Sequence, residues 1–295
     1  MSNHLVAGRT VSRVVTKVHH GPDAQVDDGA LLFTPTDPSL TDPFLIMGET
    51  WFSSPGFEWH PHRGLETVTT VLDGVLEHGD NHGNTGALEA GDIQWMTAGR
   101  GIIHRELAYR DEHAHILQLW INLPANRKLA EARYQDLTRS LRPRVNRPGT
   151  VIDVISGRVE GVMGPALNHV SIQAAALTLD PLTSYTYVLP PGHRALAYVM
   201  SGQMTIAGRT VKAGQTAWSD PVSGAAGDSA LALQTPDGDA ATRLLIYSGT
   251  PLGEPVALGG PFVMNDEAEI RQAYRDFHAG KFGEVPRQAR LHYDR

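Results

Sequence analysis

The residues of this chain best suited to chemistry are two short pairs of side chains that ligate metals. His60 and His62 lie two positions apart in the segment EWHPHRGLE. Successive side chains of a β-strand point to opposite faces, so on a strand both imidazoles point the same way. Neutral imidazole is the commonest protein ligand for borderline divalent metals. The pair alone is weak evidence, because the chain contains 14 histidines.

A second pair follows roughly 40 residues later in GDIQWMTAGRGIIHRE, where His104 and Glu106 are again two positions apart. If both pairs lie on strands of one barrel, they place three imidazoles and one carboxylate around a single ion. Such a set leaves coordination positions open, which is typical of a catalytic site. These donor types favour iron, copper, nickel or manganese over calcium or magnesium. From spacing alone, Glu66 is as good a carboxylate ligand as Glu106.

The other histidines are expected to have no metal role. His113 and His115 form a further His-x-His at the start of an apolar strand, without a partner pair. His78 and His82 lie in an expected hairpin loop, where we expect solvent exposure, with the barrel mouth as the alternative. A lone His193 in PPGHRAL is expected to be a surface or turn histidine, so the second half of the chain should hold no metal.

Two arginines inside the motifs are open to more than one interpretation. Arg63 and Arg100 lie inside the two motifs, where they either orient glutamate side chains or make packing and surface contacts. His19 and His20, which are neighbours near the N-terminus, are expected to be ordinary loop residues.

The elements that must position the two pairs are short β-strands. From Leu45 to Leu123 the sequence alternates between short apolar runs and turn signals such as Val71–Gly74 and Ala90–Asp92. The second half repeats the order of these signals in Val199–Gly202 and Ala213–Gln215, with a shorter hairpin between them. Strands at this spacing predict an all-β chain of two β-barrel (jelly-roll) domains in tandem.

The length of 295 residues also predicts two domains. We expect a metal-binding domain over residues 1–140 and a second domain without metal ligands over residues 141–295. Helix formers in residues 124–140 favour a short helix there, and the Arg- and Pro-rich residues 141–150 are expected to connect the domains. The segment NDEAEIRQAYRDFHAGKFG predicts a short C-terminal helix, capped by Asn265 or Asp266 and ended by Gly280.

The two motifs together resemble the pirin family, a group of two-domain proteins of the cupin superfamily. The resemblance lies in HPHRGLETVT and GDIQWMTAGRGIIHRE, with support from DPFLIM, LQLWINLP and GEPV…GGPFVMN, and it extends from about Asp42 to Gly283. It implies one iron-type site in the N-terminal barrel, with Fe(II) favoured over Cu, Ni, Mn, Co or Zn. It also implies that the metal ligands are His60, His62, His104 and Glu106, and that Glu66 is not a ligand.

The resemblance implies two kinds of function. Some pirins are quercetin 2,3-dioxygenases, which cleave a flavonol ring with dioxygen and release carbon monoxide. In that case a small aromatic substrate enters the apolar barrel mouth and Glu106 is the catalytic base for its 3-hydroxyl. Other pirins are metal- or redox-dependent regulators that bind transcription-related or metabolic protein partners. We rank the dioxygenase, a metal-dependent oxidoreductase, first.

Composition excludes several other classes. The net charge is −7 and the densest basic stretch, RSLRPRVNR, is short, so direct nucleic-acid binding is not expected. The chain has no cysteine, which excludes disulfides, thiolate metal sites and a cysteine nucleophile. No apolar window is long enough for a membrane span, and the N-terminus lacks the apolar core of a signal peptide. We therefore expect a cytoplasmic protein without a membrane partner.

Overall fold

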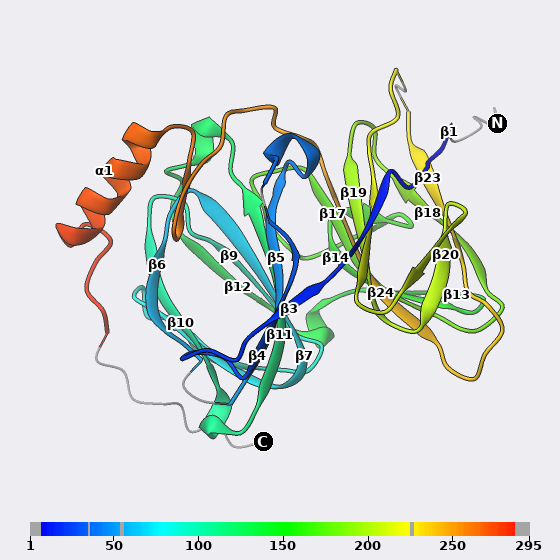
Figure 1. Cartoon of the computed structure of the whole chain (residues 1–295), viewed down its shortest axis with the longest axis horizontal. Helices are drawn as coiled ribbons and strands as arrows, with labels where there is room; N and C mark the ends of the chain where they lie inside the picture. The colour runs from blue at the N-terminus through cyan, green and yellow to red at the C-terminus, as the bar shows by residue number, and fades with distance from the viewer. Residues whose placement is uncertain (1–6, 35, 54–55, 225–226, 287–295) are drawn as a thin grey trace. The chain divides into compact units, whose positions relative to one another are not determined.

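The computed structural model describes residues 7–34, 36–53, 56–224 and 227–286. Strands dominate these ranges, and Glu267–His278 (α1) is their one α-helix (Figure 1). The expectation of an all-β chain with a short C-terminal helix is therefore confirmed. Among the described helices, none has the length and apolar character that crossing a membrane requires.

The chain folds into two compact units, and neither is continuous in sequence. The C-terminal barrel contains the described residues up to Lys17 together with Ser140–Pro251. The N-terminal barrel contains Val18–Arg139 and the described residues from Leu252 onward. One boundary between the units lies at residues 139 and 140, and each unit also includes one end of the chain, whereas the expected division was 1–140 and 141–295. The reason at the N-terminal end is strand pairing, because β2 (Arg13–Thr16) adds to the sheet of the C-terminal barrel.

The N-terminal barrel contains one sheet of ten hydrogen-bonded strands. Seven of them follow the order β12-β9-β7-β11-β5-β4-β3. Strands β6, β10 and β8 join through β7. The bounds are β3 Val18–His20, β4 Asp28–Phe33, β5 Phe44–Phe52, β6 Phe57–His62, β7 Leu65–Asp80, β8 Thr85–Glu89, β9 Ile93–Thr97, β10 Ile102–Ala108, β11 Ala114–Asn122 and β12 Arg133–Leu137, with the hairpin β25 Ala257–Gly259 and β26 Phe262–Met264.

Strand β7 is long enough to serve two parts of this barrel. Its first half pairs with β9 and β11, and its second half pairs with β8 and β10. Gly74 lies between the halves with φ of 73°, and a Cβ there would lie 2.2 Å from the His113 carbonyl oxygen. Only glycine adopts this conformation without strain. Gly74 therefore allows the two halves of β7 to pair with different strands.

Residues 124–140 do not form the expected helix. They form a 3-10 turn at Ala125–Arg127 and then strand β12, which pairs with β9. Without β12, the edge of β9 would leave backbone N–H and C=O groups without partners. Sheet pairing therefore overrides the helical propensity of this segment, and that prediction was wrong.

The C-terminal barrel has a seven-stranded and a five-stranded sheet around a core of buried Val, Leu, Ile and Ala side chains. Residues 141–150 are not a plain connection, because β13 in this segment pairs with β14. The bounds are β1 Ala7–Gly8, β13 Arg144–Arg147, β14 Thr150–Ser156, β15 Arg158–Val159, β16 Val162–Met163, β17 Ile172–Leu179, β18 Ser184–Leu189, β19 Arg194–Ser201, β20 Gln203–Ile206, β21 Arg209–Lys212, β22 Gln215–Ser219, β23 Ser229–Gln234 and β24 Thr242–Gly249.

Helix α1 forms where its sequence predicts. The Asp266 side chain caps it by accepting a hydrogen bond from Glu269 N, and acidic residues occupy its first turn. Ile270 and Ala273 are buried, whereas Tyr274, expected on the same apolar stripe, is 39% exposed. The stripe packs against β25 and β26 of the N-terminal barrel.

Candidate metal centre

The two predicted pairs lie on neighbouring antiparallel strands. In the register of β6 and β10, His104 is directly opposite His60, and Ile102 is opposite His62. Side chains two positions apart on each strand share a face, so the three imidazoles converge as the sequence predicts. The strand alternation that the sequence shows is therefore sufficient to bring residues from two distant segments together.

The three rings form a compact cluster. Their centroids are 4.3 Å apart for His60 and His104, 5.0 Å for His60 and His62, and 5.1 Å for His62 and His104. One nitrogen from each ring lies within 4.8 Å of the other two. His104 is fully buried, His62 nearly so, and His60 is half-buried. A single ion can therefore contact all three imidazoles.

Hydrogen bonds orient two of the rings. His60 Nδ1 lies 2.6 Å from the Glu58 carbonyl oxygen, and His62 Nδ1 lies 3.2 Å from that of Pro261. A carbonyl oxygen only accepts, so each Nδ1 carries the proton and each Nε2 keeps a free lone pair. Backbone carbonyls commonly fix metal-binding histidines in this way.

His104 provides the test of whether a metal fits. Both of its ring nitrogens are buried and have no hydrogen-bond partner. Buried polar atoms are nearly always satisfied, so an unpartnered imidazole beside two others needs an explanation. A metal ion at the centre of the cluster would bind one of the two nitrogens.

The electrostatics of the cluster favour the ligand form of imidazole. Burial lowers the pKa of His62 to about 3, and the neighbouring His60 contributes. Burial also lowers the pKa of His104 well below its ordinary value, with contributions from His60 and His62. A metal ligand must be neutral imidazole, and these two rings are held in that form at neutral pH.

Glu106 lies next to the cluster but is held by other groups. Thr69 Oγ1 donates to its Oε1 atom at 2.8 Å, and Gln118 Nε2 donates to its Oε2 atom at 2.8 Å. The ligand atoms that lie within 4.8 Å of one another come from the three histidines and include no Glu106 oxygen. Glu106 nevertheless lines the same cavity as His60 and His62. Its assignment as the fourth ligand stays a prediction.

The alternative carboxylate, Glu66, is occupied elsewhere. It is fully buried, Trp95 Nε1 donates to its Oε2 atom at 3.1 Å, and Thr97 Oγ1 donates to its Oε1 atom at 2.7 Å. A charged group buried with two donors is stabilised where it is. This arrangement gives Glu66 a structural role between β7 and β9.

A cavity of about 380 Å³ opens beside the cluster. Its wall is mainly apolar and includes Leu31, Ile46, Phe57, Ile116, Trp120 and Pro261. Gly48, which lies opposite Gln118 in the β5–β11 register, leaves space in the same wall. A mainly apolar cavity with a few polar groups at one place is typical of a small-molecule site.

The segment Leu252–Gly283, here called the C-terminal arm, braces the strand that carries His60 and His62. Besides the Pro261 contact to His62, Val263 N donates to the Arg63 carbonyl oxygen at 3.0 Å. The Arg63 guanidinium donates to Asp276 Oδ2 at 2.9 Å and to the Arg100 carbonyl oxygen at 2.6 Å. Arg63 therefore joins the two motifs and the arm rather than orienting a glutamate.

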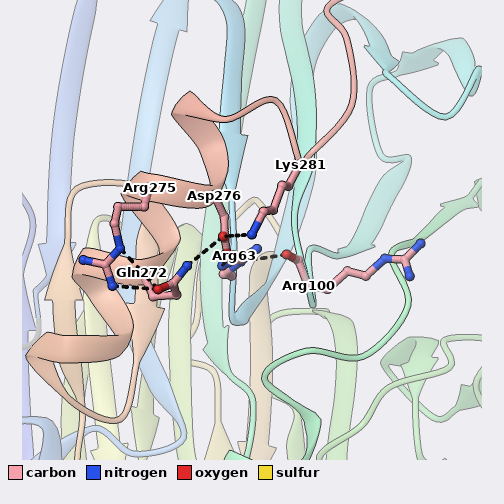
Figure 2. Close-up of polar contacts among 6 residues, drawn as sticks. All are labelled: Arg63, Arg100, Gln272, Arg275, Asp276 and Lys281. Carbon is pink, nitrogen blue, oxygen red and sulfur yellow. Dashed lines mark hydrogen bonds and ion pairs between the residues drawn. The ribbon is translucent and has the colours of Figure 1, made fainter.

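Asp276 is the centre of the polar network on the arm (Figure 2). Lys281 Nζ and Gln272 Nε2 both donate to its Oδ1 atom at 2.8 Å, on the side opposite Arg63. The hydrogen bonds from Lys281 and Arg63 hold the pKa of Asp276 well below its usual range. The carboxylate is thus ionised at neutral pH and fixes Arg63 to α1.

A second set of contacts attaches the arm where β6 ends. Lys128 Nζ donates to the carbonyl oxygens of Gly64 and Val263, both at 2.9 Å, and to Asn122 Oδ1 at 2.5 Å. Burial lowers the pKa of Lys128 to about 7. Gly64 has φ of 79°, and a Cβ there would lie 2.0 Å from the Val263 carbonyl oxygen. The close approach of the arm therefore requires glycine at this position.

Several expectations about other residues of the N-terminal barrel were wrong. His78 is buried, not exposed, and its Nε2 atom lies 3.1 Å from Asp136 Oδ2. His19 and His20 lie on β3, not in a loop, and His20 lines the cavity. Arg100 makes an exposed ion pair with Glu131, which is one of its two expected roles.

Three further histidines contact protein groups. His115 Nε2 lies 2.7 Å from Glu49 Oε1, and His113 forms an ion pair with Asp73. His193, expected to be a surface or turn histidine, directly follows a turn, where its N donates to the Pro190 carbonyl oxygen, but its side chain is buried between the hydroxyls of Ser171 and Ser248. The one group of three potential metal ligands in the described ranges is the cluster on β6 and β10.

Three residues of the site were missed from the sequence, namely Thr69, Gln118 and Trp120. A signal existed for Gln118, because it is a polar residue inside the apolar run HILQLWINL. A polar residue within such a run, on the face that lines the barrel, predicts a contact with another polar group. Thr69 has no comparable signal in its threonine-rich strand.

Comparisons with known proteins agree with the motifs. The Pirin family model matches residues 31–121, and the model of the Pirin C-terminal cupin domain matches residues 174–283. Pirin-1 of Arabidopsis thaliana is 37% identical over 95% of this chain and 96% of its own length. Pirin of Homo sapiens is 39% identical over 82% of this chain and 83% of its own length. A solved structure of quercetin 2,3-dioxygenase from Acinetobacter baumannii has a TM-score of 0.82 at 29% identity, covering 95% of this chain and all of that one.

Proposed function

The chain belongs to the pirin family and has its two cupin domains, and from this premise we propose that it is a metal-dependent dioxygenase that cleaves a flavonol such as quercetin. The observation that carries the proposal is the buried, unpartnered His104 imidazole beside His60 and His62, which themselves line a mainly apolar cavity. The likeness to a quercetin 2,3-dioxygenase supports the choice of substrate class.

In this proposal the three imidazoles hold one divalent transition metal, with Fe(II) favoured, and Glu106 is the fourth ligand. The ion, when bound, supplies Lewis acidity and redox capacity at a position open to substrate and dioxygen. The protein contributes the neutral state of the His62 and His104 imidazoles, and the carbonyls of Glu58 and Pro261 orient His60 and His62. These contributions are made before any substrate enters the cavity.

The proposed roles of the other residues follow from their chemistry. Glu106 accepts the proton of the flavonol 3-hydroxyl at a carboxylate oxygen, since each oxygen has a second lone pair beyond its present hydrogen bond. The apolar wall, including Ile46, Ile116 and Trp120, packs against the flat rings and excludes water from the reacting carbons. Both oxygen atoms of dioxygen enter the product, and one ring carbon leaves as carbon monoxide.

The test is reconstitution without oxygen. The purified protein is loaded with Fe(II), and in parallel with Cu, Ni, Mn, Co or Zn, and quercetin and air are then added while the flavonol absorbance is followed. We expect loss of absorbance with at least one metal, and no loss in His62→Ala or Glu106→Gln at equal protein concentration. Stoichiometric metal binding without turnover by any metal would contradict the dioxygenase and favour a metal-dependent regulator. A comparison of partners captured by metal-loaded and metal-free protein would then test that alternative.

A further inference from the structure

One wall of the cavity beside the histidine cluster consists of three rows of residues that cross the sheet. Residues that are directly opposite in antiparallel strands share a face, so the register of β11 and β5 defines these rows. The first row pairs Trp120 with Ile46, the second pairs Gln118 with Gly48, and the third pairs Ile116 with Thr50. All six residues line the cavity.

The first row lies at the metal end of this wall. The Trp120 ring packs edge-on against His62, with ring centroids 5.1 Å apart and an interplanar angle of 85°. The third row is the farthest from Trp120, because Ile116 precedes it by four residues on β11, which is about 13 Å at the rise of a strand. A flat molecule of several rings can therefore contact the metal end and the third row at the same time.

His20 on β3 extends the third row. It pairs with Gly29 in the register of β3 and β4, and Gly29 pairs with Thr50. The imidazole occupies the space that a Cβ of Gly29 would take, because such a Cβ would lie 2.3 Å from His20 Cε1 and 2.7 Å from Nε2. Glycine at position 29 therefore lets the imidazole lie against the sheet, where His20 lines the cavity.

His20 differs from its neighbour His19 in what its ring contacts. The His19 side chain points to the opposite face, where its Nδ1 atom lies 2.9 Å from Asp28 Oδ2 and its ring stacks on Trp51. His20 is exposed, and within the described ranges no protein group makes a hydrogen bond to its ring nitrogens. A neutral imidazole has one donor and one acceptor, and a phenolic hydroxyl pairs with either.

We propose that His20 is a specificity-determining residue that makes a hydrogen bond to a phenolic hydroxyl on the part of a flavonol remote from the metal. The proposal rests on the proposed function and adds the choice among flavonols to it. A flavonol held at the metal by its 3-hydroxyl carries its other hydroxyls on the two outer rings. The second row leaves room for the rings at Gly48, and His20 meets a hydroxyl beyond it.

The experiment measures binding rather than turnover. The protein is loaded with Zn(II), which has no redox chemistry, and is titrated with quercetin or with 3-hydroxyflavone while tryptophan fluorescence is followed. The two flavonols share the 3-hydroxyl, and only quercetin has hydroxyls on its outer rings. His20→Phe keeps a ring and removes both nitrogens. We expect it to raise Kd for quercetin about fivefold, the loss of one net hydrogen bond, and to leave Kd for 3-hydroxyflavone unchanged.

Gly29→Ala is the second variant and keeps the histidine. Position 29 lies within β4 and has no positive φ, so its backbone accepts alanine, but the new Cβ displaces the His20 ring. We expect the same selective loss of affinity for quercetin. His19→Phe makes the same substitution at the next position of the strand, on the opposite face. It is the matched control and should bind both flavonols as the wild type does.

The two flavonols separate recognition of a hydroxyl from a change in the shape of the cavity. An equal rise in Kd for both flavonols in His20→Phe would overturn the proposal. An unchanged Kd for quercetin in His20→Phe, or wild-type binding of both flavonols by Gly29→Ala, would also overturn it. In these cases the wild-type protein still binds flavonols, so only the role of His20 fails. If the wild-type protein binds neither flavonol, the proposed function fails as well.

Discussion

Replacing Asp276 with asparagine should loosen the C-terminal arm from the metal-binding strand. The Arg63 and Asp276 side chains are only 9% and 13% exposed, so water screens their ion pair weakly. A hydrogen bond to a charged group contributes about 2 kcal/mol to stability when it is largely buried. Arg63 keeps its bond to the Arg100 carbonyl oxygen in the variant and is not left without a partner. For a unit of this size, the loss corresponds to roughly 4–8 °C in Tm.

The difference in stability between the wild-type protein and Asp276→Asn should depend on pH with a definite sign. The folded state lowers the pKa of Asp276, so the pair stabilises the protein above the ordinary pKa of the carboxyl, about 3.9. The contribution is lost as the pH falls below that value and the folded state takes up the proton. Wild type and Asp276→Asn should therefore differ fully at pH 7 and approach each other under acid conditions.

The same variant should also weaken metal binding. Arg63 follows His62 directly, and the arm supplies the Pro261 carbonyl that orients that imidazole. We expect the affinity for Co(II) to fall on the order of tenfold. Thermal unfolding and chelator competition measure the two effects separately.

The control for Asp276→Asn is Glu131→Gln, which breaks the exposed ion pair of Arg100 with Glu131. Their side chains are 56% and 77% exposed, so the loss should be below about 1 kcal/mol, without a change in metal affinity. If Asp276→Asn behaves like this control, the structural reasoning about the arm is wrong. If it lowers Tm but leaves the affinity for Co(II) unchanged, the arm stabilises the fold without positioning His62.

Three further changes have defined outcomes. Gly48→Val should raise KM for a flavonol on the order of tenfold with little change in Tm, because a Cβ at this cavity-lining position meets its nearest atoms at 3.7 and 4.0 Å. Gly64→Ala should lower the free energy of unfolding by about 3 kcal/mol in urea titration, because φ is positive and the new Cβ overlaps a carbonyl oxygen. His193 has its pKa lowered by burial to about 4, so the unfolded chain binds its proton first and stability should fall from about pH 6.5 to pH 4. Urea titrations across this range should show a smaller decrease in His193→Gln, and an identical decrease would refute the assignment.

The sequence was sufficient to predict the histidine cluster because its geometry depends on strand alternation alone. His60 and His62 share a face on any strand, and so do His104 and Glu106. The prediction needed only that the two strands be neighbours, and they are. What the sequence could not show is the direction in which Glu106 points, because that depends on Thr69 and Gln118, which come from two other strands.

The last segment of the N-terminal barrel before residue 140 shows the opposite case. Residues 125–137 have helix-forming composition. A prediction from helix propensity uses only the residues of the segment itself. The decisive contact is the edge of β9, about 40 residues earlier in the chain, which needs a strand partner. Helical propensity differs between residues by well under about 1 kcal/mol, whereas a row of unpaired backbone groups costs several times more.

The C-terminal arm could not be predicted because the atoms through which it acts carry no residue signature. The groups that orient His62 and fix the Gly64 turn are the backbone carbonyls of Pro261 and Val263, and every residue has a carbonyl. Ile103, next to the ligand His104, also packs in one cluster with apolar side chains of the arm. Residues 18–139 alone would therefore leave His62 Nδ1 without its acceptor and part of the β10 face uncovered. All three proposed histidine ligands come from one stretch of the chain, but the site is complete only when the chain returns to it from beyond the C-terminal barrel.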